Sequence, residues 1–351
     1  MKRSLSAKLT LLVVIVAITS VMLLSGCGQS DRVTLKVYNW GDYIDKSVIA
    51  DFEKEHNIKV IYTTFSTNED MYVSLKSGGS TYDVVIPSEY MISRMINEDM
   101  LHKINMENIP NYKYIDDKFK SLAFDPNNEY SVPYMWGTLG IVYNKTMVDD
   151  PVDSWEILWN EKYARQILML DSQRDSIGLT LKMLGYSMNT KDLDELEQAK
   201  QKLMDQKPLV LAYVGDEVKD KMVGGEAALA VVWSGDAVAM KWENPDLEYV
   251  IPKEGGNLWF DSAVIPKVSQ HKEEAELFIN YLCETEVAFR NTDYIGYSTP
   301  HVEAMKMLDQ DLLDDSTAYP SDEEIEDCEV FEDLSDTLEI YDRIWTEIKA
   351  K

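Results

Sequence analysis

"LKVYNWGDYID", residues 35–45, begins as a strand and ends in side chains that the end of a strand does not require. Leu35 and Val37 alternate with polar neighbours, which is the pattern of a half-buried strand. An indole, a glycine, a carboxylate and a phenol follow, from Trp40 to Tyr43. Gly41 suits a turn, but a turn has no need of an indole beside a carboxylate. The stretch therefore predicts a strand whose end presents groups for binding.

Strands and helices alternate after this stretch. A helical segment from about Asp45, a residue type that caps helices, is followed by the strand "NIKVIYTTF" (57–65). A helix through Met71 and Leu75, the strand "YDVVIP" (82–87) and another helix come next. This series predicts an α/β fold with a mostly parallel sheet and crossover helices. Ligands of such sheets lie at the carboxyl ends of the strands, where "VYNWGDY" and "YDVVIPSEY" fall.

A second lobe is predicted to begin near Gly140. The segments "ILMLDSQRD", "LVLAYV" and "AALAVVWSGD" supply further strand–loop junctions, separated by amphipathic helices such as "DLDELEQAKQKLMDQK". The chain is expected to cross back near "FDSAVIPK" and again after "YSTPHVEA". We therefore expect residues 33–138 and 262–304 to form one lobe, and residues 139–261 and 305–351 to form the other.

The N-terminus has the features of an export signal. Basic residues precede an apolar run from Leu9 to Leu24, and the run ends in "LSGC", which resembles a bacterial lipobox. This order predicts a signal peptide over residues 1–26, cleavage before Cys27, and lipid (palmitate among its acyl groups) on the cysteine sulfur. Residues 27–32 then form a linker, and the protein is anchored at the outer face of the cytoplasmic membrane. An uncleaved signal anchor, or an ordinary signal with an incidental cysteine, is the alternative.

The charge of the chain favours cationic partners. Removing three basic residues with the signal peptide changes the formal net charge from -28 to -28 - 3 = -31. Such a chain repels nucleic acid and anionic lipid. Most of the carboxylates, as in "DQDLLDD" and "SDEEIEDCE", are expected to lie on solvated faces.

Cysteine and histidine give no sign of a metal site or a cofactor. Cys283 and Cys328 lie too far apart in the sequence for a disulfide to be assigned or excluded. The histidines are scattered, and no Cys-x-x-Cys or His-Glu-x-x-His spacing occurs. The four are His56, His102, His271 and His301.

Aromatic residues recur beside acids at the predicted strand ends. A single such pair is more often a core tryptophan and a turn aspartate, but three pairs at comparable positions favour a binding site. A ring face attracts an ammonium group by about 0.5 to 2 kcal/mol, and a carboxylate adds charge-assisted hydrogen bonds. Rings also cover methylene groups, at about 0.8 kcal/mol for each buried CH₂. The pattern therefore predicts a site for a linear amine with an alkyl chain.

Four segments carry a resemblance to a known family: "YNWGDYI", "YDVVIPSEYM", "EGGNLWFDSAVIP" and "GYSTPH". With them the chain resembles the spermidine/putrescine-binding receptors of bacterial ABC importers over essentially its whole mature length. The resemblance implies a two-lobed periplasmic-binding-protein fold of type II, with the ligand cleft between the lobes and an import permease as partner. By resemblance, the ligand contacts are Trp40, Asp42, Tyr43, Ser88, Tyr90, Asp171, Asp175, Trp233, Asp236, Trp259, Asp261 and Tyr297.

The chain departs from the family pattern at two places. In "LDSQRDS" Asp175 fits the second of two acids, whereas Ser172 occupies the first position and Asp171 comes one residue early. Near the C-terminus, Phe331 or Glu332 stands where a glutamine contact is expected. Asp236 resembles the putrescine-binding branch, so the preference between spermidine and putrescine stays open.

Two other classes of protein remain as alternatives. A receptor for a sugar, or for another small cationic solute, also stacks its ligand on tryptophan, but sugar clefts mix amides and arginine among their acids. Among the candidate loops only Arg174 meets that description, and a turn can direct it outward. A glycoside-acting enzyme needs a proton-donating acid that nothing in the sequence marks, and no Gly-x-Ser-x-Gly motif, phosphate loop or Cys/His pair occurs. We therefore expect a monomeric receptor and no enzyme.

Overall fold

The structure, a computed structural model, describes residues 32–79 and 81–350. The predicted signal peptide, Cys27 and most of the linker lie outside the described residues. Within the described part, no helix combines the length and the hydrophobicity that crossing a bilayer requires.

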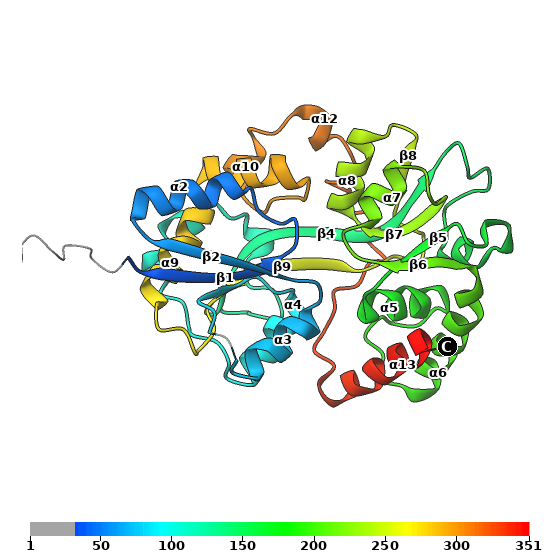
Figure 1. The fold of residues 1–351 in the computed structure, drawn as a ribbon, viewed down its shortest axis with the longest axis horizontal. Helices are drawn as coiled ribbons and strands as arrows, with labels where there is room; N and C mark the ends of the chain where they lie inside the picture. Colours follow the sequence, from blue (N-terminus) through cyan, green and yellow to red (C-terminus); the bar gives the residue numbers. More distant parts are fainter. Residues whose placement is uncertain (1–31, 80, 351) are drawn as a thin grey trace, which may run out of the picture.

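The described residues contain one mixed sheet of nine strands (Figure 1). The strands follow the order β2-β1-β3-β9-β4-β7-β5-β6, and β8 pairs with β4. Their bounds are β1 Thr34–Trp40, β2 Lys59–Phe65, β3 Val84–Val85, β4 Ser131–Asn144, β5 Ile167–Leu170, β6 Val210–Val214, β7 Leu229–Trp233, β8 Leu247–Val250 and β9 Leu258–Val264.

One half of the sheet has the predicted parallel series. β1 pairs in parallel with both β2 and β3, and the crossovers are α2 (Lys46–His56) and α3 (Asn68–Lys76), followed by α4 (Glu89–Asn97). The Asp45 carboxylate accepts a hydrogen bond of 2.8 Å from the backbone N–H of Ser47. The predicted cap of the first helix is therefore confirmed.

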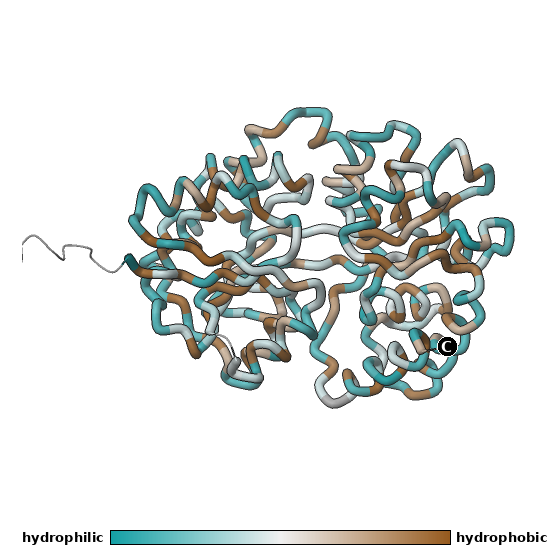
Figure 2. Tube along the Cα trace, in the orientation of Figure 1, coloured by the Kyte–Doolittle hydropathy of each residue, from teal (hydrophilic) through white to brown (hydrophobic). Residues whose placement is uncertain are grey.

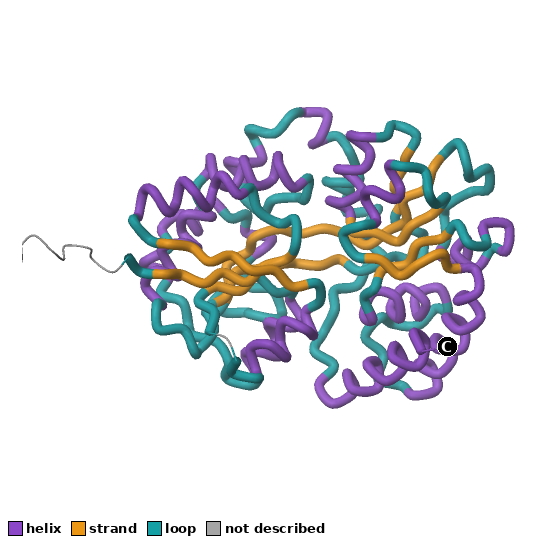
Figure 3. The backbone as a smooth tube through the Cα atoms, viewed as in Figure 1, coloured by secondary structure: helices purple, strands orange, loops and turns teal. Residues whose placement is uncertain are grey.

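The other half repeats the parallel arrangement. β5 pairs in parallel with β6 and β7. The helices of this half include α5 (Gln173–Met183), α6 (Leu193–Gln206), α7 (Val218–Val223), α8 (Ser234–Glu243) and the C-terminal α13 (Leu338–Ala350), which packs against α5 and α6 (Figure 1). Figure 3 shows helices on both faces of the strands in each half.

Two long antiparallel strands join the halves. β4 pairs with β9 from Ser131 to Thr138 and then with β7 from Leu139 to Tyr143. Each half therefore contains a parallel ladder, whereas all the pairs that β4 and β9 form, including those with β3, β7 and β8, are antiparallel, which the alternation of elements did not reveal. The lobe boundaries remain a prediction.

Hydrophobic residues concentrate along the strands of both halves (Figure 2). In the first half, Phe52 of α2 packs edge-on against Phe278 of α9 (Lys272–Leu282), with ring centroids 4.9 Å apart. A second cluster surrounds the fully buried Trp155 and the strands β5 and β7. The remaining helices are α10 (Thr285–Ile295), α11 (Val302–Met305) and α12 (Gln310–Leu313). Each half thus has its own core, and the crossing strands pass between the two.

Candidate functional site

A cavity of about 630 Å³ lies where the two halves meet. Its lining contains every residue that the sequence predicted to contact a ligand. They come from six separate segments: Trp40–Tyr43, Ser88–Tyr90, Asp171–Asp175, Trp233–Asp236, Trp259–Asp261 and Tyr297. The fold therefore brings all twelve predicted positions to one place. Which of them contact a ligand stays a prediction.

Two tryptophans at strand ends lie beside each other in the lining of this cavity. Trp40 is the last residue of β1 and packs on Phe65, with ring centroids 4.5 Å apart. Trp233 is the last residue of β7, and its ring centroid lies 6.4 Å from that of Trp40. Both strands belong to parallel ladders, whose carboxyl ends are where α/β sheets bind ligands. The positions of these two residues agree with the expectation from the sequence.

Trp259 and Asp261 lie differently from the prediction. They were placed just past a strand, but both are inside β9, where Asp261 pairs with Met135 of β4. The physical reason is that β9 crosses from one half to the other, so the middle of the strand, and not its end, passes the cavity. Alternation along the strand directs both side chains to one face, as predicted.

Three aromatic rings continue the wall beside β9. Tyr297 packs edge-on against Trp259, with ring centroids 5.3 Å apart, and against Tyr43 at 5.4 Å. Gly235 makes room for this arrangement, because a Cβ at that position would collide with the Tyr297 ring. The buried Tyr43 hydroxyl lies near Asp261 and, as a donor, helps to lower the pKa of that carboxyl. The wall therefore presents ring faces and a phenol hydroxyl to the cavity.

Asp261 is the most strongly perturbed of the predicted acids. Its side chain accepts a hydrogen bond of 2.7 Å from the Ser88 hydroxyl, and the residue is 5% exposed. Ser88 precedes α4 at the capping position, but its hydroxyl makes no cap bond and serves Asp261 instead. Burial raises the pKa of Asp261 to about 7, and the hydrogen bond from Ser88 offsets only part of that rise.

Glu89, which the sequence reading passed over, is a second buried acid near Asp261. The residue is 1% exposed, and one carboxylate oxygen accepts a 2.8 Å hydrogen bond from the backbone N–H of Phe260. Burial raises the pKa of Glu89 to about 8, and the negative charge of Asp261 adds to the rise. Glu89 therefore holds its proton at least as firmly as Asp261 does, since burial raises the pKa of both carboxyls.

Asp175 is the buried acid on the opposite side. It lies in the first turn of α5, is 5% exposed, and accepts a 2.7 Å hydrogen bond from the Ser172 hydroxyl. The Asn257 amide lies 3.4 Å from its other oxygen. Burial raises the pKa of Asp175, against the effect of these hydrogen bonds. Ser172 thus positions Asp175, which explains a serine at the first position of that motif.

The other three predicted acids already have cationic partners. Asp171 lies at the rim and pairs with Lys349 at 2.6 Å. Asp42 and Asp236 share Lys219, whose ammonium lies 3.2 Å from the first and 3.4 Å from the second. The predicted acids therefore divide into two that form no ion pair within the described residues and three that form one.

Arg174 does not point outward, the orientation considered from the sequence. It is 2% exposed, and its guanidinium lies 4.3 Å from the ring centroid of Phe331 and 4.9 Å from that of Tyr90. Its N–H groups donate to the side chain of Asn189 at 3.0 Å and to the backbone carbonyl of Glu332 at 3.2 Å. The reason is that α5 is buried along its whole first turn. Phe331, and not Glu332, lines the cavity.

The sequence reading missed several acids and lysines of the lining. Glu69, in the first turn of α3, accepts a 3.0 Å hydrogen bond from the Tyr90 hydroxyl. Asp216 and Lys219 follow β6 in "VGDEVKD", at a strand–helix junction of the same kind as those that supply the predicted contacts. Nine carboxylates line the cavity against three cations. They are Asp42, Glu69, Asp70, Asp171, Asp175, Asp216, Glu217, Asp236 and Asp261 against Arg174, Lys219 and Lys349.

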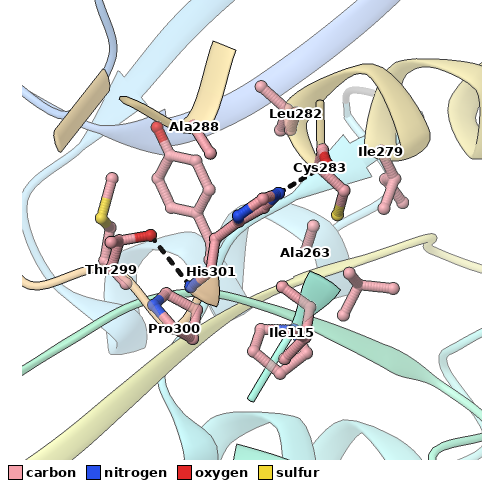
Figure 4. A pocket seen from close by; sticks show the side chains of 13 residues that line it. Ile115, Ala263, Ile279, Leu282, Cys283, Ala288, Thr299, Pro300 and His301 are labelled. Atoms are coloured by element: carbon pink, nitrogen blue, oxygen red, sulfur yellow. Dashed lines mark hydrogen bonds between the residues drawn. The ribbon is translucent and has the colours of Figure 1, made fainter. Parts of the chain in front are cut away.

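A second cavity, of about 10 Å³, has His301 and Cys283 among the residues that line it (Figure 4). One ring nitrogen of His301 bonds the Cys283 carbonyl at 3.0 Å, and the other accepts from the N–H of Ala304 at 3.0 Å. Both ring nitrogens therefore form hydrogen bonds with the backbone, and these bonds fix the chain at the start of α11. Cys283 and Cys328 are free thiols in the structure. This cavity is structural and too small for a solute.

Comparison with known sequences identifies similar proteins along almost the whole chain. Residues 47–319 match the family described as bacterial extracellular solute-binding protein. The spermidine/putrescine-binding periplasmic protein of Escherichia coli (strain K12) is 37% identical over 329 residues, which cover 93% of this chain and 94% of that protein.

Solved structures show the same similarity. A putative spermidine/putrescine ABC transporter protein from Listeria monocytogenes is 45% identical, with a TM-score of 0.88 over 90% of this chain and 98% of its own. The TpPotD lipoprotein of Treponema pallidum is 30% identical, with a TM-score of 0.82 over 91% of this chain and 100% of its own. The similarity therefore spans both halves of the sheet and both walls of the cavity.

Proposed function

This chain belongs to the family of bacterial extracellular solute-binding proteins, and we propose that it is an extracytoplasmic receptor for polyamines. It binds spermidine, putrescine or both, and delivers them to an ABC import permease. The observation that carries the proposal is the pair of buried carboxylates, Asp261 and Asp175, neither of which forms an ion pair among the described residues.

The free energy of burying these acids supports a cationic ligand. A buried carboxylate without a counter-charge is costly, and raised pKa values at Asp261 and Asp175 express that cost. An ammonium group from a ligand supplies the missing charge and the hydrogen-bond donors together. A neutral sugar supplies hydrogen-bond donors but no positive charge, so the acid-rich lining disfavours the sugar alternative.

The spacing of the two acids supports a chain with an amine at each end. Asp175 contacts the side chain of Asn257, and Asp261 comes four residues after Asn257 in the sequence. Most of the segment from Asn257 to Asp261 belongs to β9. Four residues of extended strand span about 13 Å. Trp259 lies between these two positions and offers its ring to the alkyl part of the ligand. The arrangement suits ammonium groups at both ends and methylenes between them.

The anchoring and the lobe division belong to the same proposal. We infer that the chain is exported, cleaved before Cys27 and lipidated there, since "LSGC" resembles a lipobox and a relative with 30% identity is described as a lipoprotein. We also infer that residues 33–138 with 262–304 and residues 139–261 with 305–351 act as two lobes of a monomer. Membrane release by Cys27→Ser tests the first of these inferences.

Isothermal titration calorimetry on the purified full chain in detergent tests the ligand class. Spermidine and putrescine should bind with a stoichiometry of about one, and maltose should give no heat. Binding of maltose, or no heat from any polyamine, would contradict the proposal. A hydrolysis assay on an aryl glycoside serves as the control for the enzyme alternative, and should show no release of product.

A further inference from the structure

Lys219 projects from α7 into the cavity and bridges acids of two walls. Its ammonium lies 3.2 Å from Asp42, in the loop after β1, and 3.4 Å from Asp236, in the first turn of α8. The Lys219 side chain is 23% exposed and that of Asp236 is 9% exposed, so water screens this pair only partly. The Lys219 ammonium thus pairs with carboxylates that could equally bind an ammonium group of a ligand.

The charge of Lys219 is secure at neutral pH. Burial lowers the pKa of this lysine, but the carboxylates around it, Asp236 first, outweigh burial and raise the pKa above its usual value. Asp216 is among them, and burial raises the pKa of that carboxyl. Lys219 therefore stays an ammonium group over the range in which polyamines are fully charged.

We propose that Lys219 is a resident ammonium that fills one cation position of the cavity and so limits the number of amines that a ligand can place there. The inference rests on the proposed function and specifies the ligand class further. The free positions are those at Asp261 and Asp175. A triamine such as spermidine, which has one amine more than putrescine, then finds its additional position taken.

A ligand does not readily displace this group. Lys219 is attached to the same chain as both acids, so its effective concentration at them is on the order of millimolar or higher. Displacement would also leave the partly buried lysine without its partners. The Lys349–Asp171 pair at the rim differs, because both side chains are 41% exposed and solvent weakens the interaction. The rim pair is therefore a matched control.

The test compares Lys219→Gln with Lys349→Gln, two variants that remove the same charge from the same cavity. Calorimetry on the full chain measures putrescine, spermidine and spermine. In Lys219→Gln the affinity for spermidine relative to putrescine should rise by about ten-fold or more, because Asp42 and Asp236 become available. In Lys349→Gln this ratio should stay within about two-fold of the wild-type value.

Each outcome decides something. An unchanged ratio in Lys219→Gln, with polyamine binding intact in the wild type, overturns the role of Lys219 and leaves the proposed function standing. If the wild type binds no polyamine, both fall. If Lys219→Gln does not fold, Lys219→Met, which removes the same charge and keeps a side chain of similar length, takes its place in the same comparison. An unchanged ratio in that variant overturns the inference in the same way.

Discussion

The two ends of the main cavity treat their carboxylates in opposite ways. Near β9 and the start of α5, Asp261 and Asp175 are each 5% exposed, accept hydrogen bonds from serine hydroxyls, and form no ion pair among the described residues. Near α7 and the rim, Asp42, Asp236 and Asp171 each have a lysine within 3.4 Å. Lysines of the protein itself neutralise the second group of acids, whereas the first group has no ion-pair partner until a cationic ligand binds.

The largest effect is expected from Asp261→Asn. The substitution keeps the oxygen that accepts from Ser88 but removes the charge, so a bound ammonium is left desolvated and unpaired. We expect the affinity for spermidine to fall by about 2 to 5 kcal/mol, or about 30- to 5,000-fold. Calorimetry measures the change, and circular dichroism verifies the fold. Near-normal affinity in a folded variant would place the ligand elsewhere.

The same substitution should stabilise the empty protein at high pH. The pKa of Asp261 is about 7 in the folded chain against a usual value of 3.8, a difference worth at most about 4 kcal/mol. Because the folded-state pKa is the higher one, the stabilising contribution of this group is complete below about pH 4. It is lost as pH rises through about 7.

Thermal unfolding of the ligand-free wild type and of Asp261→Asn, at pH 5 and pH 8, measures this contribution. The variant should gain stability relative to the wild type between these two values, because asparagine has no carboxyl to ionise. An equal difference in stability at both pH values would show that Asp261 ionises freely, contrary to its buried position.

Trp259→Leu should weaken binding less than Asp261→Asn. Leucine keeps apolar cover over the alkyl chain and loses mainly the cation–π attraction, about 0.5 to 2 kcal/mol. The variant also loses the edge contact with Tyr297, so the melting temperature should fall. If stability falls while the affinity for spermidine stays unchanged, Trp259 is a core residue only.

The smallest effect is expected from Asp171→Asn. Both partners of the Lys349–Asp171 pair are 41% exposed, and exposed pairs contribute about 0 to 1 kcal/mol. The affinity for spermidine should therefore change by no more than about five-fold. A loss as large as that of Asp261→Asn would mean that the ligand takes Asp171 from Lys349, and the division of the acids would then be wrong.

Local patterns account for the parts of the structure that the sequence predicted. Alternation at Leu35 and Val37 and the cap at Asp45 depend on neighbours within a few residues, and the structure contains both. The aromatic–acid residues were found because their types suit a cation, and all of them line the cavity. The strand-end rule failed at Trp259 and Asp261, since periodicity cannot distinguish a strand that ends at a cavity from one that crosses it.

The sequence by itself determined which residue types are available to a ligand: rings and carboxylates near the ends of short strands, in an acidic exported chain. Only the tertiary structure decided which carboxylates are free. Lys219 reaches Asp42 over 177 residues, Lys349 reaches Asp171 over 178, and Ser88 reaches Asp261 over 173. Burial and counter-charge both arise when distant segments meet, and these two quantities set the pKa of an acid and its affinity for an ammonium group.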